Sequence, residues 1–356
     1  MSDKKLKVLV VGCGNMGTSH ARAYNKLDGF EIAGLVSRGP ESRNRLSDEL
    51  GGLPTYGIFE EALKATKPDV VSINTYPGTH YEYVKRSLES GAHVFVEKPL
   101  ATTVEESQEL ADLAKRLDRK LVIGYILRVH PAWKKFTEVA QTLGKPLVMR
   151  MNLNQQSSGD QWKTHKSLME TMSPIVDCGV HYVDIMCLMT RSQPIMVNGI
   201  GARLSDEVSD DMYNYGQLQV TFADGSVGWY EAGWGPMISE TAFFVKDVMG
   251  PKGSVSIVDE AKGDSDDIEG HTKTGALRLH HAQLGPNGHF TKNDEIISTA
   301  DEPDHDGLCE LEQQFLLEAI QLDLDLTDHV QDAVNSLKIV LAADESFRTG
   351  QVVRLK

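Results

Sequence analysis

The feature that most restricts the possible folds of this chain is a glycine-rich turn between a strand-length apolar run and a helical segment. Its residues are Gly12, Cys13, Gly14, Asn15, Met16 and Gly17. This is the G-x-G-x-x-G pattern in the strand-turn-helix context that a dinucleotide-binding βαβ unit requires. The first glycine allows the tight turn, the second lets the backbone approach a pyrophosphate, and the third lets helix and strand pack closely. We therefore expect all of these residues except Cys13 to contact a dinucleotide at the N-terminus of the helix.

The first third of the chain alternates short apolar runs with helical segments. Runs of strand length lie at residues 6–11, 31–36, 69–74, 93–96 and 120–123. Helical spacing occupies residues 16–27, 41–50, 79–90 and 104–117. Strand and helix in regular alternation predict a parallel sheet covered on both faces, which is the doubly wound Rossmann type of α/β fold.

The pattern changes beyond residue 124. A helix is expected at 131–142, followed by alternating strands at 216–222 and 227–233 that the hairpin signal Asp224-Gly225 joins. Further strands are expected at 243–249 and 254–258, and the chain closes with helices at 308–322 and 328–347 and a strand at 351–355. The acidic stretch 259–269 is expected to be an exposed loop. With 356 residues in the chain, we predict a Rossmann domain at 1–124 and a C-terminal α+β domain with a large, mostly antiparallel open sheet at 125–356.

The residues after the second strand bear on the choice of cofactor. About 20 residues beyond the last glycine, an NAD enzyme usually offers a carboxylate to the ribose 2′-hydroxyl. Here Ser37 and Arg38 occupy these positions. A hydroxyl and a guanidinium can bind a 2′-phosphate that a carboxylate would repel. The sequence thus favours NADP(H), and NAD(H) stays open because Arg38 could instead stack on the adenine or face solvent.

Two further groups of candidate residues follow the third and fourth strands. The third strand ends in Asn74, Thr75, Tyr76 and Pro77, with His80 shortly after, and the fourth ends in Glu97, Lys98 and Pro99. Open α/β sheets bind their ligands at the carboxyl ends of the strands, so all but Pro99 are expected to contact the cofactor. A lysine at this edge can also hydrogen-bond a substrate oxygen and transfer a proton. Taken alone, Lys98 could equally be a surface cation.

A second concentration of reactive side chains lies in residues 177–184. If Pro174 begins a helix, then Asp177, His181 and Asp184 share one face. Histidine is the side chain suited to accept a proton near neutral pH. The alternative is an acidic helix N-terminus that carries a buried histidine with a structural role.

These features together resemble the glucose-fructose oxidoreductase, inositol dehydrogenase and MocA (Gfo/Idh/MocA) family. The resemblance rests on the glycine-rich turn, Glu97-Lys98-Pro99, Gly124-Tyr125 with Arg128 and His130-Pro131, Asp177-x-x-x-His181 and the final helices and strand. It implies a Rossmann domain, an α/β domain whose open sheet often joins subunits, and a catalytic trio of Lys98, Asp177 and His181. One departure is Met172-Ser173-Pro174, where the family often has a glycine-rich stretch. This difference concerns the shape of the substrate pocket more than the chemistry.

The expected activity is NAD(P)-dependent oxidation of a secondary hydroxyl, or reduction of the ketone, in a sugar, sugar derivative or inositol-like polyol. His181 would take the hydroxyl proton, Lys98 would stabilise the developing alkoxide, and Asp177 would orient them. The expected substrate-binding residues, besides Asp177 and His181, are Tyr125, Arg128, His130, Gln156, Trp162, Lys163 and His165. Two alternatives are a glycoside-cleaving enzyme that uses its cofactor for transient oxidation and elimination, and an inactive nucleotide-sensing protein.

Composition disfavours several other classes. The net charge of −15 would repel nucleic acid and anionic membranes, and no apolar run approaches the ~18 residues that span a bilayer. The four cysteines form no C-x-x-C pair, which favours a reducing cytoplasm. His280 and His281 are adjacent on an expected strand and would point to opposite faces, so we expect no metal site. A homodimer or homotetramer through the C-terminal sheet is expected from the resemblance.

Overall fold

The chain folds into two compact units, each with its own sheet. A computed structural model describes residues 5–239, 245–258, 274–299 and 302–355. The first unit comprises Met1–Val129 and Pro303–Val334, and the second comprises His130–Glu302 and Asn335–Lys356. The acidic stretch 259–269 lies outside the described residues.

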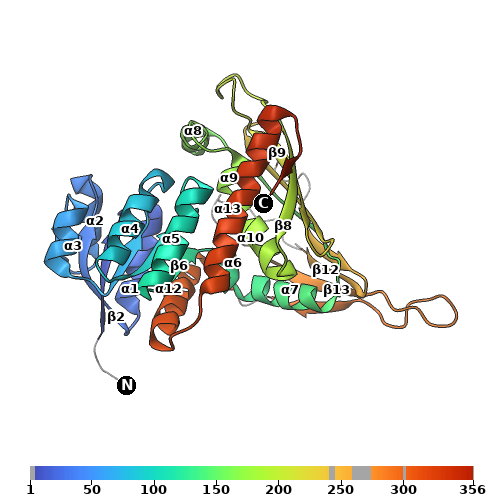
Figure 1. The fold of residues 1–356 in the computed structure, drawn as a ribbon, viewed down its shortest axis with the longest axis horizontal. Coiled ribbons are helices and arrows are strands. Elements are labelled where there is room, and N and C mark those ends of the chain that lie inside the picture. Colours follow the sequence, from blue (N-terminus) through green and yellow to red (C-terminus); the bar gives the residue numbers. More distant parts are fainter. Residues whose placement is uncertain (1–4, 240–244, 259–273, 300–301, 356) are drawn as a thin grey trace. The chain divides into compact units, whose positions relative to one another are not determined.

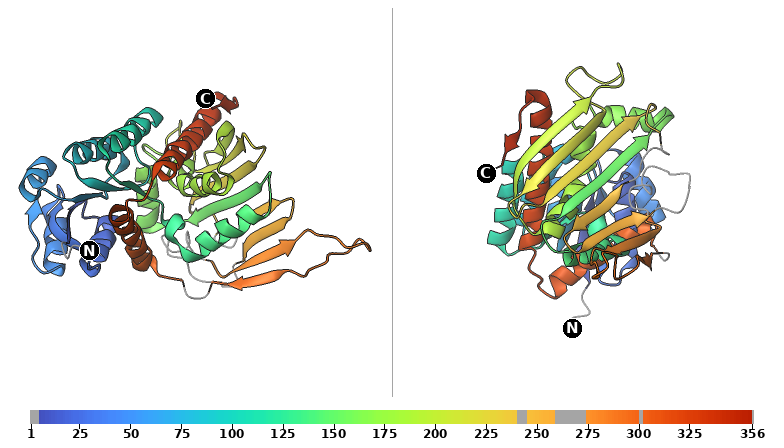
Figure 2. Two further views of the ribbon diagram at one scale, coloured as in Figure 1. Left: turned by 60° about the horizontal axis from the view of Figure 1, so that its bottom comes forward. Right: turned by 90° about the vertical axis from the view of Figure 1, so that its right-hand side faces the viewer.

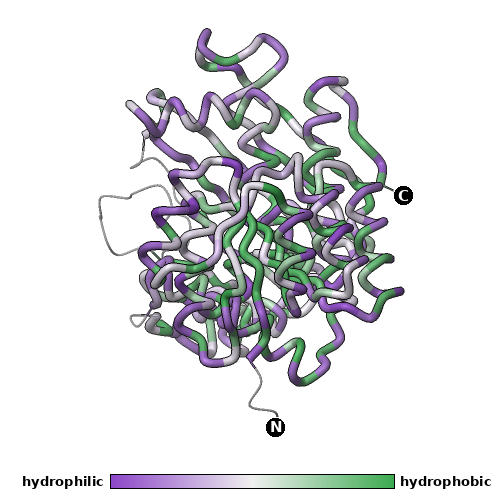
Figure 3. The backbone as a smooth tube through the Cα atoms, turned by 90° about the vertical axis from the view of Figure 1, so that its left-hand side faces the viewer, coloured by the Kyte–Doolittle hydropathy of each residue, from purple (hydrophilic) through white to green (hydrophobic). Residues whose placement is uncertain are grey.

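The first unit is built on a parallel six-stranded sheet with the order β3-β2-β1-β4-β5-β6. The strands are β1 (Leu6–Val11), β2 (Phe30–Val36), β3 (Thr55–Tyr56), β4 (Val70–Ile73), β5 (His93–Glu97) and β6 (Leu121–Gly124). The strand order reverses between β1 and β4, which is the switch point where sheets of this type bind ligands. Strands β4 and β6 are buried along their whole length, and the interior of this unit appears mostly green, or hydrophobic, in Figure 3. The predicted parallel sheet is confirmed.

Helices cover both faces of this sheet (Figure 1). They are α1 (Asn15–Lys26), α2 (Pro40–Glu49), α3 (Phe59–Thr66), the short 3-10 helix η1 (Pro77–Thr79), α4 (His80–Glu89), α5 (Val104–Leu117), α6 (Ile126–Val129), α12 (His305–Gln321) and the start of α13 (Thr327–Thr349). The start of α5 follows from its residues, because the side chain of Thr103 accepts the N–H of Glu106 and two glutamates occupy the first turn. Helices α1, α2, α4 and α5 each lie within one residue of the predicted ranges.

The first unit does not contain the residues that we predicted for it. We expected the first domain to end at residue 124 and the final helices to belong to the second domain. The chain returns to the first unit in α12, where Leu316 and Leu317 join the core formed by Tyr24 and Phe30. This return depends on contacts between residues almost 300 positions apart. Local periodicity carries no information about such pairings.

The second unit is built on a nine-stranded sheet with the order β14-β13-β12-β11-β7-β10-β9-β8-β15. The strands are β7 (Val148–Gln156), β8 (Pro194–Ala202), β9 (Tyr215–Phe222), β10 (Val227–Gly235), β11 (Lys246–Gly250), β12 (Gly253–Val258), β13 (Ala276–His281), β14 (Glu295–Ser298) and β15 (Val353–Arg354). Only β7 and β10 pair in parallel. The predicted hairpin is confirmed: β9 and β10 are antiparallel, and Gly225 supplies the positive φ of +83° that the turn needs.

Helices lie behind this sheet in the right-hand view of Figure 2, where its strands face the viewer. They are α7 (Pro131–Thr142), α8 (Gly159–Leu168), α9 (Pro174–Asp177), α10 (Gly179–Thr190) and the later part of α13. Along β9, and at the start of β7 and β10, buried side chains alternate with more exposed ones, which is the pattern of a sheet with one covered face. The mostly antiparallel open sheet is therefore confirmed.

Helix α7 begins with a histidine that caps it. His130 Nδ1 accepts the backbone N–H of Ala132 at 3.2 Å, and the imidazole is 1% exposed. Burial lowers the pKa of His130 to about 4. The cap requires a nitrogen lone pair, so the folded protein holds this imidazole neutral.

This cap predicts an acid-sensitive component of stability. Between pH ~6.5 and pH ~4 the unfolded chain binds a proton at His130 that the folded chain does not, so the free energy of unfolding falls as the pH falls. The loss reaches about 3 kcal/mol near pH 4. In His130→Asn, where asparagine can cap the helix without titrating, we expect a shallower pH dependence in chemical denaturation. Replacing the exposed His289 with asparagine is the control, and equal slopes in all three proteins would contradict the assignment.

Candidate functional site

The glycine-rich turn of the first unit is packed tightly against the end of β4. Gly12 has a φ of +91°, and its N–H donates to the carbonyl of Val36 at 2.8 Å. A Cβ on Gly12 would lie 2.5 Å from the carbonyl oxygen of Asn74, and one on Gly17 would lie 1.8 Å from the carbonyl oxygen of Gly12. Both glycines are therefore required by the packing of the turn.

Gly14 differs from its two neighbours because it faces open space. A Cβ built on it would meet no atom within 4 Å. Gly14 is also the N-cap of α1, which has no side-chain cap and no acidic residue in its first turn. Free N–H groups beside open space are what a dinucleotide pyrophosphate requires. The turn therefore fits such a cofactor, with Asn15 and Met16 beginning the helix.

The loop after β2 places hydroxyl and guanidinium groups together. Ser37 Oγ lies 3.2 Å from Ser42 Oγ, and Arg43 Nη1 donates to the carbonyls of Ser37 at 2.6 Å and Arg38 at 3.1 Å. The Arg38 side chain is exposed. Ser42 and Arg43 were not among the residues expected from the sequence, because they belong to α2 and reach back to the loop. The residues that directly follow β2 carry no carboxylate.

The loop after β4 begins with a buried residue, Asn74, and continues to an exposed one, Tyr76. Asn74 donates its N–H to the carbonyl of Val11 at 2.8 Å, and its side chain hydrogen-bonds Ser72. Thr75 Oγ1 lies 2.7 Å from Thr79 Oγ1, and the Tyr76 side chain is 74% exposed. Pro77 begins η1. Asn74 thus ties this loop to the end of β1, and Tyr76 is available to a ligand.

His80 holds two of these loops together. Its Nδ1 lies 2.8 Å from the carbonyl oxygen of Pro99 and its Nε2 lies 2.8 Å from that of Thr75, and the ring is fully buried. Burial lowers the pKa of His80, although both carbonyls act in the opposite direction. We expected His80 to contact the cofactor, but both ring nitrogens are engaged by the backbone. It therefore supports the loop that carries Lys98.

Glu97 and Lys98 follow β5 at the same edge of the sheet. Glu97 Oε1 lies 2.7 Å from His20 Nε2, and Glu97 Oε2 accepts the N–H of Lys98 at 3.3 Å. Burial alone would raise the pKa of Glu97, but the hydrogen bond from His20 and nearby positive charge lower it. Glu97 is buried, whereas Lys98 is partly exposed. Glu97 is thus buried beneath the loop, and Lys98 is the more accessible of the two.

The reactive segment of the second unit is two helices where the sequence predicted one. Ser173 Oγ accepts the N–H of Val176 at 3.2 Å and so starts α9, which ends at Asp177. Cys178 separates it from α10, and the N–H of His181 donates to the Cys178 carbonyl at 3.2 Å. Asp177 is partly exposed at the end of α9, His181 is buried in the first turn of α10, and Asp184 is fully buried. Asp177 and His181 are therefore carried by a helix junction.

A buried polar network fixes this junction from behind. Ser173 Oγ donates to Asp344 Oδ1 at 2.8 Å, and the Tyr213 hydroxyl donates to both Ser173 and Asp344. Burial raises the pKa of Asp344. These contacts link α9 to α13 and to the loop before β9, so the position of Asp177 depends on three separate segments of the second unit.

Aromatic and amide groups lie beside the junction. Cys178 Sγ lies 3.5 Å from Gln155 Oε1, which also accepts the indole N–H of Trp234. The His165 ring stacks on Trp234 with centroids 4.4 Å apart and planes at 10°, and its Nδ1 lies 3.0 Å from Ser157 Oγ. His165 was expected from the sequence. Trp234 was not, because nothing local marks the end of β10 as a neighbour of α8.

The other substrate-binding residues expected in the second unit have other hydrogen-bond partners or are exposed. The buried Trp162 donates its indole N–H to Glu207 at 3.2 Å, and the exposed Lys163 pairs with Asp160 at 2.7 Å. Gln156 is exposed at the end of β7, and His130 caps α7 as described above. The structure brings none of these four into the network around Gln155.

Tyr125 and Arg128 belong to the first unit. Arg128 Nη2 donates to Asp332 Oδ2 at 2.7 Å, and its guanidinium lies 6.0 Å from the centre of the Tyr125 ring. His329 belongs to the same group, because its Nε2 accepts the N–H of Ile123 at 3.0 Å. The Arg128 ion pair is largely buried. These contacts give Arg128 a structural role between β6 and α13.

Two remaining expectations concern histidines and membranes. His280 Nδ1 lies 2.8 Å from Asp294 Oδ1, and His281 Nε2 lies 2.6 Å from Glu295 Oε1. The two side chains are thus engaged by separate acidic residues. No helix in the described part of the chain has the length and apolar character needed to cross a membrane.

Comparison with known proteins finds relatives of this chain in sequence and in structure. D-glucoside 3-dehydrogenase of Escherichia coli is 28% identical over 52% of this chain and 54% of its own length, so the chain matches about half of that relative. The scyllo-inositol 2-dehydrogenase (NAD(+)) of Bacillus subtilis is 26% identical over 99% of this chain and 97% of its own. The crystal structure of apo scyllo-inositol dehydrogenase from Lactobacillus casei has the same fold, with a TM-score of 0.79, 19% identity and 99% of both chains covered.

Two family models match the chain in the order of its two sheets. Residues 6–125 match the oxidoreductase family with an NAD-binding Rossmann fold, and residues 139–256 match the GFO/IDH/MocA C-terminal domain. The first match contains the glycine-rich turn and Lys98, and the second contains Asp177 and His181. Because the two models together cover more than half of the chain, it belongs to the GFO/IDH/MocA oxidoreductase family.

Proposed function

We propose that this protein is a nicotinamide-dependent dehydrogenase that transfers a hydride between its cofactor and a secondary hydroxyl or ketone of a sugar or polyol. The observation that carries the proposal is the packed turn of Gly12 and Gly17 beside the open space at Gly14. It lies at the same sheet edge as Lys98, because both follow parallel strands at their carboxyl ends. Membership of the oxidoreductase family supports the same reaction class.

The turn would bind the pyrophosphate through the N-terminus of α1, and the loop after β4 would contact the nicotinamide half through Thr75 and Tyr76. Nicotinamide supplies the hydride acceptor or donor of the reaction. We favour NADP(H), because Ser37, Arg38 and Arg43 place hydroxyl and guanidinium groups where a 2′-phosphate would lie. NAD(H) would be the cofactor if these groups serve only the loop.

The choice of cofactor is testable at Arg38, whose exposed side chain has no structural task in the loop. We expect Arg38→Ala to weaken NADP(H) binding about ten- to hundredfold, the value of one charged hydrogen-bonding partner, and to leave NAD(H) binding almost unchanged. Titration calorimetry with both cofactors measures this, with the exposed Arg116→Ala as the control. Unchanged NADP(H) affinity in Arg38→Ala would show that the 2′-phosphate is not bound there.

The remaining chemistry is proton transfer. Oxidation of an alcohol releases a hydride from carbon and a proton from oxygen. We propose that His181 takes the hydroxyl proton, that Lys98 stabilises the negative charge growing on the oxygen, and that Asp177 orients the pair. In the reverse direction the same groups return the proton to the ketone oxygen. Support for Asp177 as the orienting group comes from its fixed position at the end of α9.

A sugar or polyol substrate fits the surroundings of Asp177. Gln155 offers an amide, and the stacked His165 and Trp234 offer an aromatic surface beside a ring nitrogen. Such a combination of apolar faces with a few hydrogen-bonding groups suits a ring that carries several hydroxyls. Two relatives named above act, by their names, on a glucoside and on an inositol.

The experiment is a scan for cofactor-dependent absorbance change against sugars, inositols and their keto forms. Net reduction of NADP⁺ or NAD⁺ by one of them supports the dehydrogenase. Cleavage of a glycoside without net change in the cofactor would favour the elimination mechanism instead. Tight cofactor binding with no turnover on any compound would favour a nucleotide sensor.

We also propose a cytoplasmic homodimer or homotetramer in which a second copy covers the open face of the nine-stranded sheet. Val148 and Val227 are cross-strand neighbours exposed on this face, and Ile200 is exposed on β8. Burial of such side chains favours association. We expect sedimentation equilibrium to give a dimer or tetramer and Val227→Lys to shift it toward the monomer. A monomeric wild-type protein at micromolar concentration would contradict this.

A further inference from the structure

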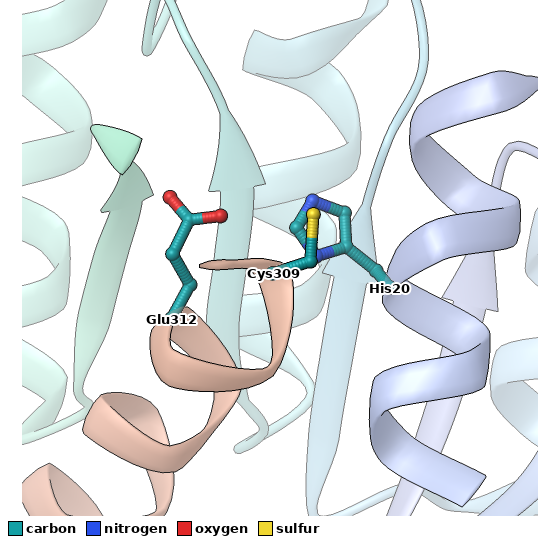
Figure 4. A group of neighbouring side chains, drawn as sticks. All are labelled: His20, Cys309 and Glu312. Atoms are coloured by element: carbon teal, nitrogen blue, oxygen red, sulfur yellow. The ribbon is translucent and has the colours of Figure 1, made fainter. Parts of the chain in front are cut away.

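A buried group of metal-binding side chains lies in the first unit, away from the glycine-rich turn. His20 comes from α1, and Cys309 and Glu312 come from α12 (Figure 4). One ligand atom from each of the three lies within 4.8 Å of the others, and all three side chains are buried. The group offers nitrogen, sulfur and oxygen, which is the set of donors that zinc-class ions bind in proteins.

One oxygen of the Glu312 carboxyl group has no partner in its buried position. Glu312 Oε1 is inaccessible to solvent and has no hydrogen bond, and the same is true of Gln313 Oε1 on the next residue. An unpaired buried carboxyl group is costly. A bound cation would remove that cost, and a proton on Glu312 is the simpler alternative.

His20 is oriented as metal-binding histidines commonly are. Its Nε2 lies 2.7 Å from Glu97 Oε1, and its Nδ1 lies 2.9 Å from Gln313 Nε2. A carboxylate that accepts the hydrogen of one ring nitrogen leaves the lone pair on the other. The amide N–H of Gln313 can only donate, so Nδ1 carries the lone pair that a metal ion would use. An ion would replace this amide contact.

Cys309 and Glu312 are three residues apart on α12 and therefore lie on one face of the helix. Cys309 Sγ also lies 3.7 Å from His305 Nε2, one turn earlier. A divalent ion bound by thiolate and carboxylate would be neutralised by the two ligands, with release of the protons that they carried.

We propose that His20, Cys309 and Glu312 form a structural site for a divalent zinc-class ion that joins α12 to α1. Such a link would stabilise the fold, because α12 returns to the first unit from a distant part of the sequence and packs on α1 and the core. The proposal does not depend on the dehydrogenase chemistry, but the site adjoins it, because His20 contacts Glu97 beneath the loop that carries Lys98. The site's role would be to hold α12 against the helix that begins at the glycine-rich turn.

The test is the metal content of full-length protein expressed in zinc-supplemented and, separately, cobalt-supplemented medium. We expect one ion per chain in the wild type and in Cys187→Ser, a control at another buried cysteine. We expect a loss of tenfold or more in Cys309→Ser and Glu312→Gln. The cobalt protein should also show intense near-ultraviolet absorption from a sulfur-to-cobalt transition, which Cys309→Ser removes.

Thermal melting provides a second readout, which measures stability and not metal content. If a metal is bound, Glu312→Gln melts at a lower temperature than the metal-loaded wild type. If Glu312 instead carries only a proton, the amide is neutral or stabilising. Wild-type protein that holds only a trace of metal after supplementation, or metal content that is the same in Cys309→Ser, would overturn the proposal. Should Cys309→Ser not fold, the cobalt spectrum of the wild type decides.

Discussion

Replacement of Lys98 by alanine is expected to lower kcat for alcohol oxidation by about 10²–10⁴-fold. The ammonium group is the one cation that we assign to the oxygen on which negative charge grows, and Lys98 is held at the edge of β5 by the loop that His80 supports. Its loss should affect kcat more than the cofactor affinity, because the charge it stabilises exists mainly in the transition state. Steady-state kinetics on a working substrate, with cofactor affinity measured separately, tests this. The exposed Lys64→Ala is the control.

His181 provides the companion measurement. We expect His181→Ala to lower kcat over a similar range, and a small added base such as imidazole to restore part of it, because only the proton acceptor is missing. Rescue would distinguish a base from a residue that merely packs in α10. If neither Lys98→Ala nor His181→Ala lowers turnover, the catalytic assignment is wrong.

The second large effect is expected at Gly17. A Cβ there would lie 1.8 Å from the carbonyl oxygen of Gly12, and this backbone group cannot move aside as a flexible side chain could. We expect Gly17→Ala to lower the free energy of unfolding by about 2–3 kcal/mol and to abolish measurable cofactor binding. Chemical denaturation and cofactor titration of the same preparations measure the two effects.

Gly14→Ala is the matched variant, because a Cβ at this position meets nothing within 4 Å. We expect its stability without cofactor to equal that of the wild type, and its cofactor affinity to fall because the methyl group occupies the space assigned to the pyrophosphate. The exposed Arg116→Ala is the control for both measurements. Unaltered cofactor affinity in Gly14→Ala would mean that the pyrophosphate does not approach this turn.

The parallel sheet and most of its helices could be predicted because their signals are local. The strand 6–11 and the helix 104–117 were predicted with the bounds observed for β1 and α5. Burial on both faces makes a strand continuously apolar, and a helix pattern repeats within a few turns. The edge of the sheet at which Ser37, Asn74 and Lys98 lie follows from the parallel topology alone.

Features that depend on distant contacts could not be predicted in this way. The return of α12 to the first unit and the position of Trp234 beside His165 both join residues whose neighbourhood is set by tertiary packing. The junction between α9 and α10 was not foreseen, because the spacing of Asp177, His181 and Asp184 suits one helix that begins at Pro174. Its capping residue, Ser173, was visible in the sequence, but the break at Cys178 was not.

Transfer of deuterium tests the central claim of hydride transfer most directly. A polyol or sugar that carries deuterium on its hydroxyl-bearing carbons is incubated with oxidised cofactor, and the reduced cofactor is examined by mass spectrometry. We predict that one deuterium appears in the nicotinamide ring with wild-type protein and that the rate of its appearance falls by about 10²-fold or more with Lys98→Ala. Cofactor that stays free of deuterium with every compound, although the protein binds it, would contradict the proposed reaction.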